Sequence, residues 1–85
     1  MNRHEAICKE LNEIYIKKNS DYGDSFGETY RKLGIISAVT RISDKTNRLQ
    51  NLCINDTKVK DESIRDTLID LANYAILTLM EMEEE

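Results

Sequence analysis

The chain of 85 residues contains no proline and no tryptophan, and its three glycines fall at positions 23, 27 and 34. Residues that break helices are thus confined to one short region, and long helices can form on either side of it. No run of β-branched residues has a period of two, which argues against strands. We therefore predict an all-α fold, a small bundle of about three to four helices, in a single domain over residues 1–85.

Cysteine and histidine are also scarce, with two cysteines and one histidine in the whole chain. Cys8 and Cys53 lie on separate predicted helices without CxxC spacing, which favours two reduced core residues over a disulfide. His4 falls in the first turn of the first predicted helix, and no HExxH motif, glycine-rich phosphate loop or nucleophile elbow is present. The chemistry that remains is that of carboxylates beside lysine and arginine.

Charge and hydropathy limit the partners that the chain can take. The formal net charge of -4 and the isoelectric point near 5.0 argue against nucleic acid as a partner. No apolar run approaches the roughly 18 residues of a membrane span, and no leading apolar segment resembles a signal peptide. We expect a cytoplasmic protein without a membrane partner. A chain of this length buries only a modest core, so we also expect self-association.

Apolar spacing predicts helices over about residues 3–18, 28–32, 35–53 and 61–80. The buried face of the first helix is predicted at Ile7, Leu11, Ile14 and Tyr15. The buried face of the third is predicted at Ile35, Val39, Ile42, Leu49 and Leu52. The buried face of the last is predicted at Leu68, Leu71, Ala72, Ala75, Ile76 and Leu79. The polar connection before residue 61 is short, so these last two helices are expected to pack antiparallel.

Residues 17–27 combine turn formers with two acids, two aromatic residues and two glycines, and we predict a loop there. Loops that carry aromatic residues outside a strand often form part of a pocket. Tyr22 or Phe26 would then stack on a flat ligand, and Lys17 or Lys18 would meet its phosphate. In the alternative interpretation, both rings plug the end of a helical bundle.

A polar stripe runs along the last predicted helix. Glu62, Asp66, Asp70 and Asn73 follow one another at i, i+4, i+8 and i+11 and share one helix face. Aligned acids beside an apolar face suit a divalent cation such as Mg²⁺, which takes oxygen ligands. The alternative is a solvated face whose acids pair with nearby bases.

The third predicted helix supplies further candidates. Asp44, together with Asp66 and Asp70, would hold Mg²⁺ and form the catalytic set for metal-assisted hydrolysis of a phosphoanhydride. Arg41, Lys45 and Arg48 are placed to receive phosphate oxygens. An intrahelical pair between Asp44 and Arg48 is the structural alternative for those two residues. The polar turn at Lys45 interrupts the apolar rhythm and indicates a polar neighbour.

Three blocks of sequence resemble a known family. They are DYGDSF at residues 21–26, RISDKTNRL at 41–49 and VKDESIRDTLIDLANYA at 59–75. In this order they resemble the nucleotide modification associated domain 1 family, small helical proteins frequent in phages and prophages of Gram-positive bacteria. The resemblance spans about residues 13–80 and implies, for a phage-encoded chain, a location in the host cytoplasm.

That family is in turn similar to the MazG-like all-α nucleoside triphosphate pyrophosphohydrolases. The similarity implies a bundle completed as a homodimer or higher homo-oligomer, with Mg²⁺ and a nucleotide between helices. The MazG-like pattern has ExxE on one helix and ExxD on the next. Residues 44–47 stand at the first motif, with Asp44 retained and the amide Asn47 in place of an acid. Residues 67–70 stand at the second, with Asp70 retained and Asp66 one residue out of register.

Two functions follow as hypotheses, both of which require a bound nucleotide. The first is a Mg²⁺-dependent nucleotide pyrophosphohydrolase with Asp44, Asp66 and Asp70 as catalytic metal ligands. The predicted nucleotide contacts are Lys18, Tyr22, Phe26, Arg41, Lys45, Asn47, Arg48 and Asn73. The second, given as the alternative to hydrolysis, is a phage sponge that sequesters, without turnover, a nucleotide second messenger of host defence, and the incomplete acid pattern fits it. A purely structural helical module would leave the aromatic loop and the polar stripe unexplained.

Overall fold

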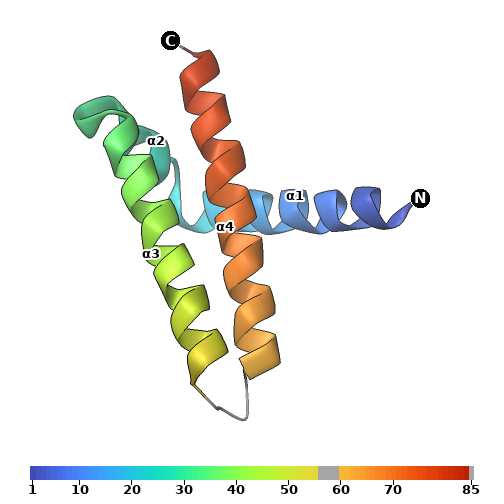
Figure 1. Ribbon diagram of the computed structural model, residues 1–85. Coiled ribbons are helices and arrows are strands. Elements are labelled where there is room, and N and C mark those ends of the chain that lie inside the picture. Colours follow the sequence, from blue (N-terminus) through green and yellow to red (C-terminus); the bar gives the residue numbers. More distant parts are fainter. Residues whose placement is uncertain (56–59, 85) are drawn as a thin grey trace.

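A computed structural model describes residues 1–55 and 60–84, and within these ranges it contains α-helices and no strand, as predicted (Figure 1). The helices are α1 (Arg3–Tyr22), α2 (Ser25–Leu33), α3 (Ile35–Ile54) and α4 (Lys60–Glu83). Residues 56–59 of the predicted polar connection lie outside the described ranges. Because α1 ends later and α2 begins earlier than predicted, the expected loop over residues 17–27 shrinks to residues 23 and 24.

The turns between the first three helices depend on glycine. Gly23 and Gly34 have φ angles of 69° and 80°, in the region that favours glycine, and each closes the preceding helix by donating its N–H to a carbonyl of the last turn. Asp24 then caps α2, since its carboxylate accepts a hydrogen bond of 3.1 Å from the N–H of Gly27. A Cβ at Gly27 would lie 2.5 Å from both carboxylate oxygens, so a side chain there would displace the Asp24 carboxylate from its present position.

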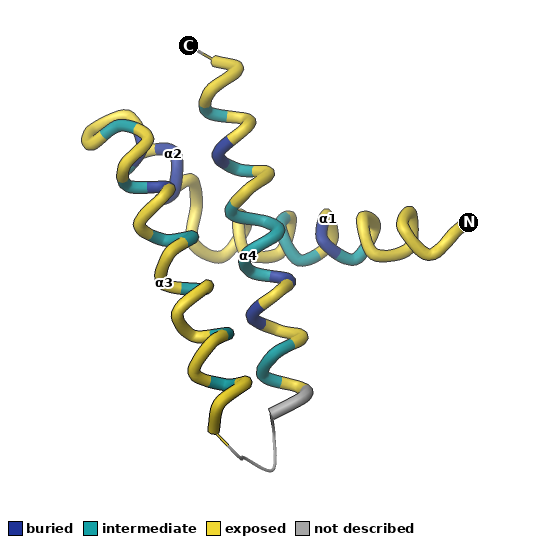
Figure 2. Tube along the Cα trace, viewed as in Figure 1, coloured by how far each residue is buried: buried dark blue, intermediate teal, exposed yellow. Residues whose placement is uncertain are grey.

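Helices α3 and α4 lie side by side and antiparallel, as predicted, while α1 crosses α4 at a steep angle (Figure 1). α2 packs against the end of this pair that holds the N-terminus of α3. The N-terminal turns of α1 extend beyond the bundle and are exposed (Figure 2). α4 is therefore the element that every other helix contacts, with α3 on one flank and α1 on another.

The core is small. Phe26, Tyr30 and Ala38 form a buried cluster between α2 and α3, and Tyr74 and Leu77 of α4 pack against it. Leu11 of α1 and Ile69 of α4 are also buried. None of the described helices has the length and apolar content that crossing a membrane requires.

Several predictions of burial are wrong. Ile7, Ile35, Val39, Leu68, Ile76 and Leu79 were expected to be buried and are exposed. On α4 the reason is that α3 packs against the adjacent face, which carries the buried Thr67 and Thr78 and the partly buried Tyr74. Cys8 and Cys53, predicted as core residues, are free and exposed. The presence of these helices was thus predicted correctly, whereas the faces by which they pack were predicted only in part, with Leu11 buried as expected.

Candidate functional site

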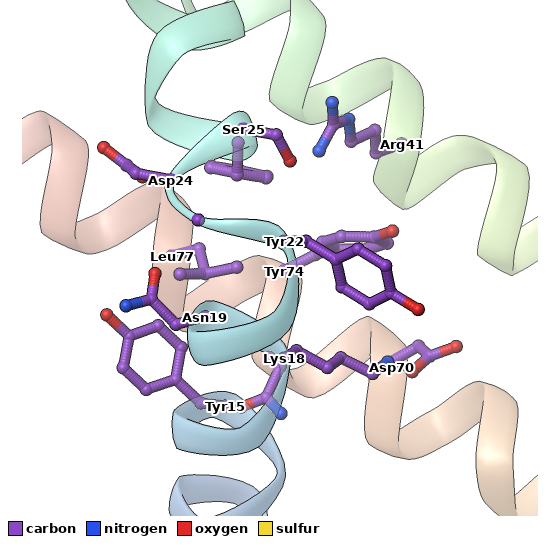
Figure 3. A pocket seen from close by; sticks show the side chains of 13 residues that line it. Tyr15, Lys18, Asn19, Tyr22, Asp24, Ser25, Arg41, Asp70, Tyr74 and Leu77 are labelled. Carbon is purple, nitrogen blue, oxygen red and sulfur yellow. Dashed lines mark hydrogen bonds and ion pairs between the residues drawn. The ribbon is translucent and has the colours of Figure 1, made fainter.

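A cleft with a volume of about 390 Å³ opens where α1, α3 and α4 meet the beginning of α2 (Figure 3). α1 lines it with Tyr15, Lys18, Asn19 and Tyr22. α4 lines it with Asp70, Asn73, Tyr74 and Leu77. In both helices these positions stand at i, i+3, i+4 and i+7, which is the spacing of a single face. The α1–α2 turn and α2 contribute Gly23, Asp24, Ser25 and Phe26, and α3 contributes Arg41.

A carboxylate that bridges two lysines closes one side of the cleft. Lys18 of α1 extends toward α4 and places its Nζ 3.0 Å from one oxygen of Asp70 (Figure 3). Lys45 of α3 places its Nζ 3.2 Å from the other oxygen. Three helices therefore meet at one carboxylate. The prediction that Lys45 faces a polar neighbour is confirmed.

The charge of Asp70 is stabilised at this position. Partial burial by itself would raise the pKa of its carboxyl group. The hydrogen bonds and positive charges of Lys18 and Lys45 outweigh that effect and lower the pKa below its ordinary value. Asp70 is consequently an anion at neutral pH, and its role in this arrangement is to hold two cations at the edge of the cleft.

The two aromatic residues of the predicted loop have different environments. Phe26 is only 8% exposed and stacks on Tyr74, with ring centroids 5.8 Å apart and planes inclined by 19°. Tyr22 is 76% exposed and lines the cleft from the end of α1. The interpretation of a bundle plug is therefore correct for Phe26. Tyr22 is the ring of this pair whose surface is open to a ligand.

Arg41 is the cation of the cleft that has no anionic partner within the part of the chain that the structure describes. Its guanidinium carbon lies 5.2 Å from the centroid of the Phe26 ring, so a cation–π contact fixes its position. Among the described residues it forms no ion pair and donates no hydrogen bond, although the side chain is partly buried. A guanidinium carries five donors in a rigid fork and suits phosphate or carboxylate groups. These donors are available to a ligand.

Six predicted site residues come together around the cleft, namely Lys18, Tyr22, Phe26, Arg41, Asp70 and Asn73. Lys45 adjoins them through its ion pair with Asp70. Asn73 has a structural task as well, because its Nδ2 donates a hydrogen bond of 3.2 Å to the backbone carbonyl of Leu11. This bond ties α1 to α4 next to the cleft.

The other predicted site residues do not line the cleft. Asp44 and Asn47 are exposed on α3. Arg48 donates from Nε to the hydroxyl of the buried Thr67, at 3.2 Å, so it serves the α3–α4 contact. Within the described residues no ion pair joins Asp44 to Arg48, and the predicted intrahelical pair is wrong.

The predicted metal set is not assembled within one chain. Across residues 1–55 and 60–84, no group of three or more His, Cys, Asp or Glu side chains is placed to hold a metal ion. Asp44 and Asp66 are exposed and neither lines the cleft, while a lysine occupies each carboxylate oxygen of Asp70. The residues present do not fit Mg²⁺ at the predicted position, because Asp70 is committed to two cations of the protein itself.

Asp66 lines a second hollow of about 300 Å³. It shares this hollow with Glu10 of α1 and Arg65 of α4, which form a bidentate pair with N–O distances of 2.6 and 2.8 Å. Lys18 and Asp70 border both hollows. The polar stripe predicted as a metal site is thus largely the surface on which α1 docks.

Tyr15, Asn19 and Tyr74 line the cleft but were missed as site residues. The signal for the first two was present in the sequence. If α1 is extended to Tyr22, then Tyr15, Asn19 and Tyr22 share a face with Lys18 at helical spacing. Ending that helix at residue 18 concealed the pattern. Tyr74 lies within a block used for the family resemblance but was assigned no role.

Fold and cleft together define a small all-α protein with an aromatic cleft that carries a free guanidinium. The family model of nucleotide modification associated domain 1 matches residues 18–82, which is most of the chain. The chain belongs to this family, and the resemblance inferred from its three sequence blocks is confirmed. The matched range includes every residue that lines the cleft except Tyr15. No curated protein and no solved structure matches the chain.

Proposed function

We propose that the cleft binds a nucleotide. The observation that carries this proposal is Arg41, a partly buried guanidinium held on the Phe26 ring without an anionic partner among the described residues. Among the described residues no buried side-chain nitrogen or oxygen lacks a hydrogen-bond partner, so the Arg41 donors are open to solvent. A phosphate group can replace water on them with charge-assisted hydrogen bonds. The volume of about 390 Å³ lies within the usual range for small-molecule sites.

The lining divides into a phosphate end and a base end. Arg41 would bind phosphate oxygens in bidentate fashion, and Lys18 at the edge would add a second positive charge. The exposed ring of Tyr22 would stack on the base, a contact worth about 1–3 kcal/mol in other systems. Asn19 and Asn73 place carboxamides in the same cleft and can read the polar edge of a base or sugar.

Binding without turnover is the form of this function that the geometry supports best. Hydrolysis of a phosphoanhydride needs a metal or a general base near the attacked phosphorus. Both acids that line the cleft are already paired, Asp70 with two lysines and Asp24 with Arg31. Such a protein would sequester its nucleotide, as a phage sponge sequesters a second messenger of host defence. Mg²⁺-dependent pyrophosphohydrolysis is the alternative, and it would require additional acids from a second copy.

Ligand retention tests the proposal directly. The protein is incubated with a panel of nucleoside triphosphates, cyclic nucleotides and ADP-ribose-type nucleotides, with and without Mg²⁺, and the supernatant is chromatographed before and after heat denaturation. We expect at least one nucleotide to disappear from solution and to return intact on denaturation. Formation of pyrophosphate and monophosphate would favour the hydrolase. Complete indifference to the whole panel would refute nucleotide binding.

Arg41→Met provides the matched variant, because methionine retains an unbranched apolar stem and loses every donor. We expect it to weaken nucleotide binding at least tenfold, which corresponds to about 1.4 kcal/mol, with unchanged helical content. Arg3→Met is the control, since Arg3 is exposed at the start of α1, remote from the cleft, and the change in charge is the same. Equal affinity of the two variants would show that Arg41 does not bind the ligand.

We further propose that the functional unit is a homo-oligomer in the cytoplasm. The accessible surface of one chain is 6443 Å², whereas a compact monomer of this mass exposes roughly 5,200 Å². The radius of gyration is 14.1 Å, compared with about 12 Å for a compact domain of this length. The chain therefore exposes about 1,200 Å² more than expected, which exceeds the roughly 800 Å² that each partner buries in a standard interface.

A further inference from the structure

The outer face of α4 carries an apolar seam that the described parts of the other helices leave largely open. The seam consists of Leu68, Ala72, Ala75, Leu79 and Met82, spaced by 4, 3, 4 and 3 residues. This alternation is that of the a and d positions of a coiled coil. Leu68, Leu79 and Met82 are 49%, 56% and 46% exposed, and the neighbouring Ile76 is exposed as well.

The seam lies opposite the cleft. At 100° per residue, the mean direction of the four cleft positions on α4 differs by about 170° from that of the seam. α3 and α1 occupy the two flanks between them, since Arg48 of α3 contacts Thr67 and Glu10 of α1 contacts Arg65. A partner helix on the seam would therefore leave the cleft of each copy open.

We infer that the seam binds the α4 seam of a second copy, and that the two helices run antiparallel with Ala75 at the twofold axis. This inference rests on the proposed self-association and specifies the surface that is used. A second copy is the occupant that matches the surface, because the same heptad spacing on both partners makes the seam self-complementary. The surplus of exposed surface calculated above is large enough for such an interface.

Two features of the sequence select the antiparallel orientation. The C-terminal end of α4 is acidic, with Glu83 as its last residue and Glu84 directly after it, while Glu81 is paired with Arg31. In a parallel pair these ends would repel one another at contact distance. An antiparallel pair separates them by the length of the seam, roughly 20 Å, which is beyond the Debye length at physiological salt. Ala72 and Ala75 also place the smallest side chains at the midpoint of the seam, where antiparallel helices can approach most closely.

Disulfide cross-linking between copies locates the interface. In a background with Cys8→Ser and Cys53→Ser, both of which replace exposed thiols, Ala75→Cys is oxidised at micromolar protein concentration. At a twofold axis the two thiols are held within reach, so we expect covalent dimer to form at least about tenfold faster than for Glu13→Cys, an exposed position on α1. A rate no higher than that of Glu13→Cys would overturn the inference.

Mixing Leu68→Cys with Met82→Cys tests the orientation. Antiparallel packing predicts the mixed disulfide, whereas a parallel pair would link each variant to itself and would contradict the proposed orientation. Ile36→Cys, on the exposed apolar surface at the start of α3, tests another location. Cross-linking there with none at Ala75 would assign the contact to that surface and overturn the seam.

Leu79→Glu and Leu33→Glu form a matched pair of variants whose molar mass in solution is compared. Both introduce the same charge at an exposed leucine, and only Leu79 belongs to the seam. We expect Leu79→Glu to halve the mass measured by light scattering, and Leu33→Glu to leave it unchanged. Both should retain wild-type helical content and one bound nucleotide per chain. The reverse pattern of masses would overturn the seam, while loss of nucleotide retention in wild type would refute the proposed ligand and not this interface.

Discussion

Two parts of the molecule are held in place by different forces. One part is formed by α2, α3 and α4, and the other is helix α1, which crosses α4. In the first, Phe26, Tyr30 and Ala38 are buried together beneath Tyr74 and Leu77. In the second, one buried side chain, Leu11, is accompanied by polar links from α1 to α4. These links are Lys18 to Asp70, Glu10 to Arg65, and the carbonyl of Leu11 to Asn73.

This difference matters because the cleft lies between the two parts. Apolar contacts respond little to salt or pH, whereas ion pairs at a surface respond to both. The wall formed by α2, α3 and α4 is therefore the fixed one. The wall formed by α1 is attached mainly through side chains that also face the cleft. Lys18 is one of them, so an anion bound in the cleft would compete with Asp70 for its positive charge.

The largest expected effect comes from truncating the apolar part. We expect Phe26→Ala to lower the free energy of unfolding by about 3–5 kcal/mol, because it removes a buried ring, and with it the stacking contact to Tyr74, from a small core. Urea denaturation followed by circular dichroism measures the loss. Leu11→Ala is the comparison, since we expect it to expose the amides of α1 to hydrogen exchange while those of α3 and α4 stay protected. Equal exchange throughout the chain in Leu11→Ala would show that the two parts are not distinct.

A smaller effect is expected at the junction of the two parts. Asp70→Asn removes the charge that holds Lys18 and Lys45, and we expect a loss of about 1 kcal/mol or less, because both pairs are partly exposed and screened. High salt should reduce the difference from wild type. Asp66→Asn is the control, an exposed acid one turn away without an ion pair among the described residues. If Asp66→Asn were as destabilising as Asp70→Asn, the bridging role of Asp70 would be wrong.

The helices were predictable from the sequence because their signals are local. The absence of proline and the clustering of glycine left few places at which a helix could end, and Gly23 and Gly34 do end α1 and α2. The two residues of the turn were harder to delimit, because Ser, Asp and Asn occur both in loops and at helix ends. That ambiguity concealed the face of α1 that lines the cleft.

The site was only partly predictable because its residues depend on tertiary packing. A stripe of acids on α4 has the same spacing whether it binds a metal or docks another helix. Only the position of α1, which brings Lys18 to Asp70 and Glu10 to Arg65, decides between these roles. The apolar seam posed the same problem, since helical spacing identifies an apolar face but not the chain that covers it.

The smallest expected effect is the acid dependence of the junction. The lysines lower the pKa of Asp70, and a hydrogen bond from Arg65 lowers that of Glu10 despite some opposing desolvation. A carboxyl group whose pKa is lowered on folding binds its proton more readily in the unfolded chain. It therefore stabilises the fold above its unfolded pKa, about 3.9 for Asp, and this contribution disappears as the pH falls through the folded pKa.

We accordingly expect the stability difference between wild type and Asp70→Asn to be constant near neutral pH and to shrink below about pH 4, as Asp70 becomes protonated. Urea denaturation of both proteins at a series of pH values measures this difference. Glu10→Gln should behave in the same way over a similar range, because its pair with Arg65 also joins α1 to α4. A difference that grew as the pH fell would mean that the carboxylate is destabilised on folding, which would contradict its role in holding α1 on α4.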